Sequence, residues 1–144
     1  MHAAVMGLDY GLRRIGVAVG SHLSGSGTPV ATLAAQHGQP DWHQLSELVK
    51  TWRPACAVVG LPHYADDAPH PLAAPIQAFR QELMQRYNFE VYTIDEHLSS
   101  TAAAQRLGLA GRGRRHSAQQ QDIDRMSAVI ILETWFALGH DHGS

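Results

Sequence analysis

Three acidic residues stand at the ends of apolar segments, where an ionised carboxylate is costly unless a positive charge or hydrogen-bond donors meet it. Asp9 ends the apolar run of residues 5–8, Glu96 follows the run 91–94, and Asp124 opens a long apolar segment near the C-terminus. A divalent cation bound by all three carboxylates would neutralise their charge. Carboxylates with no accompanying cysteine or histidine cluster form a hard, all-oxygen site, which suits Mg²⁺ or Mn²⁺ and poorly suits structural zinc.

Such a site has a well-defined chemistry. Two ions about 3.5–4 Å apart activate a water molecule and stabilise the leaving oxygen in phosphodiester hydrolysis. We therefore predict a metal-dependent nuclease with Asp9, Asp124 and one acid of the adjacent pair Asp95 and Glu96 as metal ligands and catalytic residues, two ions as cofactors, and no side chain acting as nucleophile.

Each acid also has a structural interpretation. Asp124 could cap a helix or complement its dipole, yet positions 128, 131 and 135 on the same helix face hold Ala, Ile and Trp. That face predicts that Asp124 points toward a sheet, and Asp122 fits the capping role better. Asp9 could instead accept backbone hydrogen bonds in a turn. Asp95 and Glu96 are adjacent and point in different directions from a strand, so spacing leaves open which of them faces the site.

The elements that must position these acids can be read from the period of the apolar residues. Residues 5–9 and 15–19 predict a hairpin around a glycine-containing turn, and residues 28–33 a third strand of the same meander. Asp41 predicts the start of a helix that Pro54 stops. Residues 56–61 form a near-continuous apolar strand of the buried parallel type.

The second half of the chain continues this alternation of helix and strand. We expect a helix carrying Ile76, Phe79 and Leu83, a strand over residues 90–94, a short helix ending at Leu107, a mobile loop over 108–121 and a last helix over about 123–138. The order predicts an α/β fold, a five-stranded mixed sheet in which an antiparallel meander joins parallel strands, with helices on both faces. The carboxyl ends of parallel strands share one edge, the usual place for a ligand.

Composition sets the remaining limits. The 144 residues, 44% of them hydrophobic, predict one domain over residues 1–138 followed by a flexible tail over 139–144. A net charge of -2 gives no global basic footprint, so nucleic-acid contacts must come from local arginines. Cys56, the single cysteine, lies in an apolar run and is expected to be a buried core thiol. With no leader and no membrane-spanning segment in view, we expect a soluble, cytoplasmic protein.

Two groups of arginines are candidates for holding phosphates. Arg13 and Arg14 follow Asp9 in the first hairpin turn, and Arg112, Arg114 and Arg115 lie in the glycine-rich segment 108–121. Glycine and arginine together also describe a solvated, flexible loop, and that interpretation stays open for the second group. Trp42 and Trp52 fall on the apolar stripe of their helix and are expected in the core.

Four segments carry a resemblance to a known family. They read DYGLRRIGVA (9–18), VGLP (59–62), DEHLSS (95–100) and DRMSAVIIL (124–132). Their order and spacing resemble the successive motifs of the YqgF/RuvX family, and the similarity spans nearly the whole chain. The resemblance implies an RNase H-like fold and an activity described as Holliday junction resolution or processing of the 5′ end of pre-16S rRNA. It also implies Asp9, Glu96 and Asp124 as the acidic positions, and so selects Glu96 over Asp95.

The chain departs from the family pattern at two places. His97 stands where the acid-rich motif usually has arginine, leaving a weaker, pH-dependent cation, and we hypothesise that activity needs more acidic or metal-rich conditions. An unchanged pH-rate profile in His97→Arg would refute that. The loop after VGLP begins His63-Tyr64 where the family commonly carries Asn and an Asp-Gly turn.

The expected substrate is RNA. Two alternatives remain open: cleavage of branched DNA, and nucleic-acid binding without turnover. The oligomeric state also remains open between a monomer and a homodimer.

Overall fold

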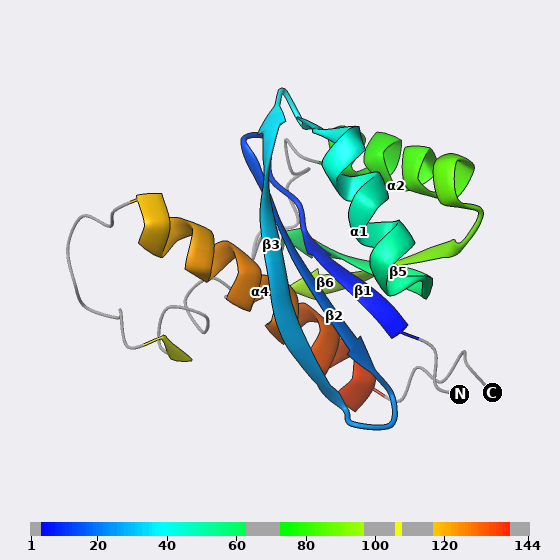
Figure 1. Cartoon of the computed structure of the whole chain (residues 1–144), viewed down its shortest axis with the longest axis vertical. Coiled ribbons are helices and arrows are strands. Elements are labelled where there is room, and N and C mark those ends of the chain that lie inside the picture. Colours follow the sequence, from blue (N-terminus) through cyan, green and yellow to red (C-terminus); the bar gives the residue numbers. More distant parts are fainter. Residues whose placement is uncertain (1–3, 63–72, 97–105, 108–116, 139–144) are drawn as a thin grey trace.

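The computed structural model describes residues 4–62, 73–96, 106–107 and 117–138, whose strands form one mixed sheet (Figure 1). The strands are β1 (Ala4–Asp9), β2 (Arg14–Ser21), β3 (Ser26–Gln36), β4 (Gln39–Pro40), β5 (Pro54–Pro62) and β6 (Glu90–Glu96). The helices are α1 (Trp42–Trp52), α2 (Ala73–Tyr87) and α4 (Ser117–Ala137). The sheet order is β4-β3-β2-β1-β5-β6. Strands β1 to β4 pair antiparallel, whereas β1, β5 and β6 run parallel, as the sequence predicts.

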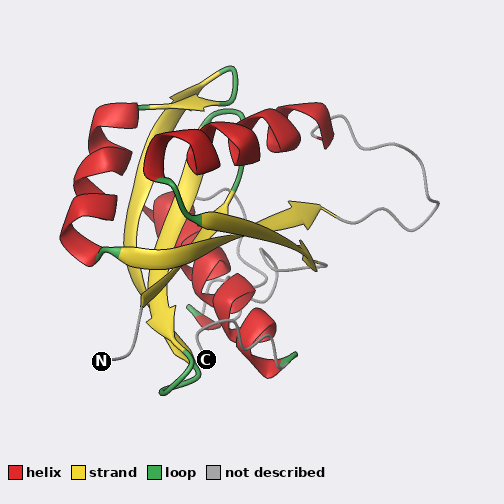
Figure 2. Cartoon of the chain, turned by 90° about the vertical axis from the view of Figure 1, so that its right-hand side faces the viewer, coloured by secondary structure: helices red, strands yellow, loops and turns green. Residues whose placement is uncertain are grey.

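Strand alternation divides the core into two layers. Met6 and Leu8 of β1 pack with residues of α1 and α2 on one face of the sheet, whereas Val5 packs with α4 on the other. Figure 2 shows the sheet between these helices. Burial on both faces explains why β1 and β5 read as continuous apolar runs rather than alternating ones. Cys56 is buried in the layer beneath α4, as expected for a core thiol.

Helix α1 begins and ends where local chemistry predicts. The Asp41 side chain accepts hydrogen bonds from the backbone N–H groups of His43 and Gln44, which caps the helix. Arg53 adopts a left-handed conformation with φ of 48° at the C-terminal end, and Pro54 opens the next strand. The expectation for Trp52 was wrong: Trp52 is the last residue of α1 and is 42% exposed.

The sheet has six strands rather than five. The additional strand, β4, has two residues and pairs with the end of β3 across a turn at His37 and Gly38, both with positive φ. An element this short carries no apolar period, so a pattern of alternation cannot find it.

The last helix starts earlier than predicted. Helix α4 begins at Ser117, so residues 117–121 are helical and not part of a loop. The apolar period starts only at Ile123 because the preceding turn is polar, and this end of α4 projects beyond the sheet (Figure 1). Most of the expected short helix ending at Leu107, residues 108–116 of the expected loop and the tail 139–144 lie outside the described residues. No helix of the described part is long and apolar enough to cross a membrane.

Candidate active site

A row of three residues crosses the antiparallel meander at the end of β1. Asp9 of β1 lies opposite Gly16 of β2, and Gly16 lies opposite Thr32 of β3. Residues that lie opposite each other on neighbouring strands share a sheet face. By strand parity Asp9 belongs to the face of Val5 and Gly7, and both of these contact α4 or its core layer. The row therefore lies beneath α4.

Gly16 lets α4 approach the sheet at this row. A Cβ atom added at Gly16 would lie 1.9 Å from the backbone oxygen of Asp124, a distance that no side chain tolerates. Thr32 holds the same turn of the helix, since its hydroxyl donates to the carbonyl oxygen of Gln121 at 2.7 Å. The backbone of Asp124 is thus fixed directly over the strand pair that carries Asp9.

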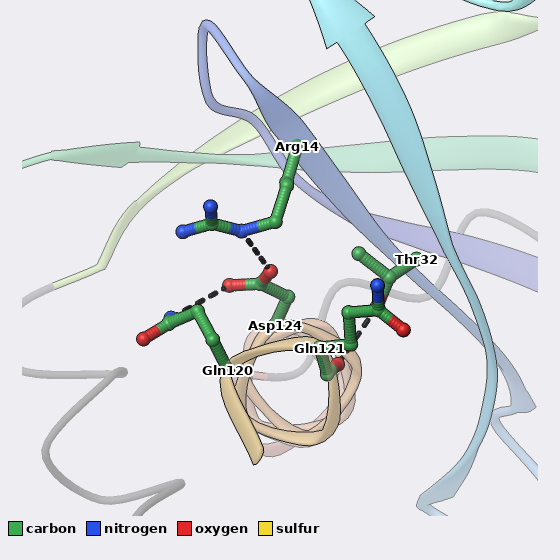
Figure 3. Close-up of polar contacts among 5 residues, drawn as sticks. All are labelled: Arg14, Thr32, Gln120, Gln121 and Asp124. Atoms are coloured by element: carbon green, nitrogen blue, oxygen red, sulfur yellow. Dashed lines mark hydrogen bonds and ion pairs between the residues drawn. The ribbon is translucent and has the colours of Figure 1, made fainter. Parts of the chain in front are cut away.

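The Asp124 carboxylate is nearly buried and is held by two side chains (Figure 3). Arg14 at the start of β2 donates from Nε to Oδ2 at 2.7 Å, and Gln120 donates from Nε2 to Oδ1 at 3.2 Å. The Asp124 side chain is 12% exposed and that of Arg14 is 42% exposed. The buried anion therefore has a cationic partner that reaches into solvent.

The helix start excludes a capping role for Asp124. Ser117 begins the helix, so Asp124 lies two turns inside it, and Ala128, Ile131 and Trp135 on its face are buried. The predicted orientation toward the sheet is confirmed. The capping role considered for Asp122 is wrong for the same reason, and its carboxylate instead accepts a hydrogen bond from Arg125 on the helix surface.

Asp9 and Asp124 line one pocket of about 460 Å³. Its other walls are residues 10–14 of the first hairpin turn, including Arg13 and Arg14, and Gln120 of α4. Both arginines of the first predicted group therefore lie beside the acids. Arg112, Arg114 and Arg115, as well as His97 and the segment starting at His63, fall outside the described residues.

Glu96 is placed by the register of the parallel strands. Asp9 lies opposite Gly60 of β5, and Gly60 lies opposite Ile94 of β6. Position 96 is two residues beyond Ile94, which packs beneath α4, so it has the strand parity of the face that carries Asp9. Position 95 has the opposite parity. The backbone thus brings positions 9 and 96 to the same edge of the sheet, as the strand order predicts.

Tyr10 also borders the pocket but has a structural role. Its ring packs against Phe79, and its hydroxyl donates to the carbonyl oxygen of Gly38 at 2.9 Å. Burial raises the pKa of Tyr10, which keeps the phenol protonated as this donor. Tyr10 therefore stabilises the turn between β3 and β4 through this hydrogen bond and does not supply an acid or base.

The donor set fits a hard divalent cation. Asp9 and Asp124 supply carboxylate oxygens to an open pocket, and Asp124 already attracts a cationic group. Within the described part of the chain, no three histidine, cysteine, aspartate or glutamate side chains form a ready metal cluster. Glu96, the third residue of the predicted set, is the last residue of β6.

Three residues that shape the site were not predicted from sequence: Gly16, Thr32 and Gln120. Gln120 had a usable signal, because it lies four residues before Asp124 on one helix face. Gly16 also had a signal, because an isolated glycine inside a strand pattern indicates a bulge or the close approach of another backbone. Thr32 had none, since its importance depends on the register that places it beneath α4.

Known proteins resemble this chain over nearly its whole length. Residues 3–138 match the model of the RuvX family, described as Holliday junction resolvase. A Methylococcus capsulatus protein named "Putative pre-16S rRNA nuclease" is 42% identical over 137 residues, covering 94% of this chain and 89% of its own. A Nitrosococcus oceani protein of the same name is 40% identical, covering 91% of this chain and 84% of its own.

Solved structures show the same fold at low identity. A Thermus thermophilus RuvC in complex with a Holliday junction substrate aligns with a TM-score of 0.52 and 16% identity, over 96% of this chain and 97% of that one. A fowlpox virus resolvase in complex with Holliday junction DNA aligns with a TM-score of 0.53 and 10% identity, over 96% and 99%. The sheet and its helices are those of the RNase H-like fold, and the chain belongs to the RuvX family.

Proposed function

We propose that this chain, a nuclease by its family, cleaves the 5′ end of pre-16S rRNA at the pocket formed by β1, the first hairpin turn and α4. In this proposal Asp9, Glu96 and Asp124 hold divalent cations, while Arg13 and Arg14 hold phosphates. The observation that carries the proposal is the approach of α4 to β2 at Gly16, which sets the Asp124 carboxylate beside the end of β1.

The chain's own residues account for the requirements of phosphodiester hydrolysis. Asp9 and Asp124 border an open pocket, so a backbone phosphate has access to both. Arg13 and Arg14 line it too, and the arginine guanidinium matches phosphate oxygens in a bidentate way. A bound Mg²⁺ or Mn²⁺ ion supplies the positive charge that activates the attacking water and stabilises the leaving oxygen. No described side chain is required as a nucleophile.

The choice of RNA rests on the relatives. The curated proteins at about 40% identity carry the pre-16S rRNA name over most of their length. The description of the matching family supports a second candidate substrate, a four-way DNA junction. Both substrates would use the same acids, because both present a phosphodiester to the pocket.

The test presents both substrates to the purified protein. We expect Mn²⁺- or Mg²⁺-dependent cleavage of a model RNA spanning the 5′ end of pre-16S rRNA, and slower or no cleavage of a four-way DNA junction. Asp9→Asn serves as the control for a contaminating nuclease. Faster cleavage of the junction would favour the second candidate. No cleavage with or without metal, together with no metal effect on melting temperature, would instead indicate a binding module without turnover.

A further inference from the structure

The contact between Arg14 and Asp124 joins a buried anion to an exposed cation. Nε of Arg14 lies 2.7 Å from Oδ2 of Asp124, and Gln120 occupies the other carboxylate oxygen, Oδ1. Only 12% of the Asp124 side chain is exposed, compared with 42% of Arg14. Figure 3 shows Arg14 reaching down from β2 to the carboxylate, while its terminal nitrogens point away from Asp124.

We propose that Arg14 is a displaceable counter-cation, which holds Asp124 until a divalent ion takes its place and then binds the phosphate of the substrate. This inference rests on the proposed function, because it assumes that Asp124 is a metal ligand. It adds an exchange of partners at that ligand.

The two cations compete for one carboxylate. Each oxygen of the Asp124 carboxylate already accepts one hydrogen bond, and only 12% of the side chain is exposed, so burial rather than acceptor capacity limits access for a further partner. A guanidinium and a divalent ion on the same oxygen also repel each other strongly away from bulk water. The divalent ion therefore binds the Asp124 carboxylate only when the Arg14 guanidinium dissociates from it.

The released Arg14 guanidinium can remain in the same pocket and bind a phosphate there. Arg14 is the first residue of β2, directly after the hairpin turn, and its side chain borders the same pocket as Arg13 and Asp9. It is half-exposed, so it can move without unpacking the core. A phosphate brought to that pocket meets a guanidinium that no longer has a carboxylate partner. Metal and substrate then favour each other's binding, and the coupling is reciprocal.

Mn²⁺ binding in the absence of nucleic acid tests the competition. We would measure free Mn²⁺ by electron paramagnetic resonance with the wild type, Arg14→Gln, Arg13→Gln and Asp124→Asn. Arg13→Gln is the matched control, since it removes the same charge from the same pocket, and among the described residues Arg14, not Arg13, forms the ion pair with Asp124. We expect Arg14→Gln to bind Mn²⁺ about three- to tenfold more tightly than the wild type. Arg13→Gln should give a smaller gain, and Asp124→Asn should bind more weakly than the wild type.

A second measurement follows the contact itself in the wild-type protein. The Nε–H resonance of Arg14 in the NMR spectrum can be assigned by its loss in Arg14→Lys. It should shift on titration with diamagnetic Mg²⁺, with a midpoint at the dissociation constant for Mg²⁺. A resonance that stays unmoved at saturating Mg²⁺ overturns the exchange, even if Arg14→Gln does not fold. So does an Arg14→Gln affinity no greater than that of Arg13→Gln.

The outcomes separate this inference from the proposed function. If the wild type binds Mn²⁺ and Asp124→Asn binds it weakly, but neither Arg14 readout changes as expected, only the exchange is wrong. If the wild type binds no Mn²⁺ and Asp124→Asn cleaves RNA as fast as the wild type, the metal site is wrong and the exchange with it.

Discussion

The close approach of α4 to β2 makes Gly16→Ala the most informative single substitution in this chain. The added Cβ would lie 1.9 Å from the Asp124 backbone oxygen and 2.4 Å from its carbonyl carbon, whereas ordinary contact begins near 3.4 Å. Both neighbours are backbone atoms, so no side-chain rotation relieves the clash. Helix α4 or β2 must move by roughly 1.5 Å at this point, the difference between the clash and ordinary contact.

Such a shift should lower the cleavage rate more than it lowers the stability of the fold. Overpacking of this kind costs roughly 1–3 kcal/mol of stability. A misplacement of about 1 Å at a catalytic group costs about 100-fold in rate. Asp124 would move away from Asp9, and the Thr32 hydroxyl would lose its hydrogen bond to the carbonyl oxygen of Gln121. We therefore expect a folded protein with a lowered melting temperature, weaker Mn²⁺ binding, and a single-turnover cleavage rate reduced by about 100-fold.

Gly27→Ala is the matched control. Gly27 faces the same helix, but its added Cβ would first meet the terminal Cδ1 of Leu132 at 3.3 Å, and a side-chain end can adjust. We expect wild-type cleavage and a small change in melting temperature. Wild-type cleavage and melting in Gly16→Ala would refute the argument that this glycine sets the distance between α4 and β2. A destabilised Gly16→Ala with full activity would show that the approach serves stability alone.

Two further predictions concern the hydroxyl of Thr32 and the thiol of Cys56. Thr32→Val removes the donor to Gln121 but keeps the shape, so we expect cleavage and Mn²⁺ affinity to fall about fivefold while Thr32→Ser retains both, measured by single-turnover rate and titration. Equal behaviour of the two variants would contradict this role. Burial first, and then the charge of Glu90, raise the pKa of Cys56 to about 11 from 9.0. The folded state keeps this proton longer than the unfolded state, so the resulting stability is present below pH 9 and lost as pH rises through about 11. Cys56→Ala should lose less stability over that interval in urea titrations, and an equal loss would argue against this cause.

The positions of Asp9 and Asp124 followed from the sequence because each depends on local pattern. An apolar run ending in an acid predicted Asp9 at the carboxyl end of β1, and the buried helix face of Asp124 predicted its orientation. The parallel pairing of β5 and β6 followed from the crossover helix between them. These signals survive in one sequence because periodicity and strand order are properties of the chain itself.

The rest of the site depends on relations between distant segments. That Gly16 lies between Asp9 and Thr32 is a matter of register, and a shift by one residue would place other side chains beneath α4. The start of α4 was missed because its first turns have no apolar period. The Arg14–Asp124 pair spans 110 residues, and no spacing rule connects two such positions.

The cleavage rate of Asp124→Asn tests whether the Asp124 carboxylate holds a catalytic divalent ion. Asparagine keeps the size of the side chain and can still accept the hydrogen bond from Arg14 or Gln120, so the fold should remain, while the charge that holds a divalent ion is lost. The measurement is the single-turnover rate on the pre-16S rRNA substrate at saturating Mn²⁺, with the melting temperature as the check on folding. We predict a loss of more than about 100-fold in a folded protein. A folded Asp124→Asn that cleaves at the wild-type rate would show that the Asp124 carboxylate holds no catalytic ion.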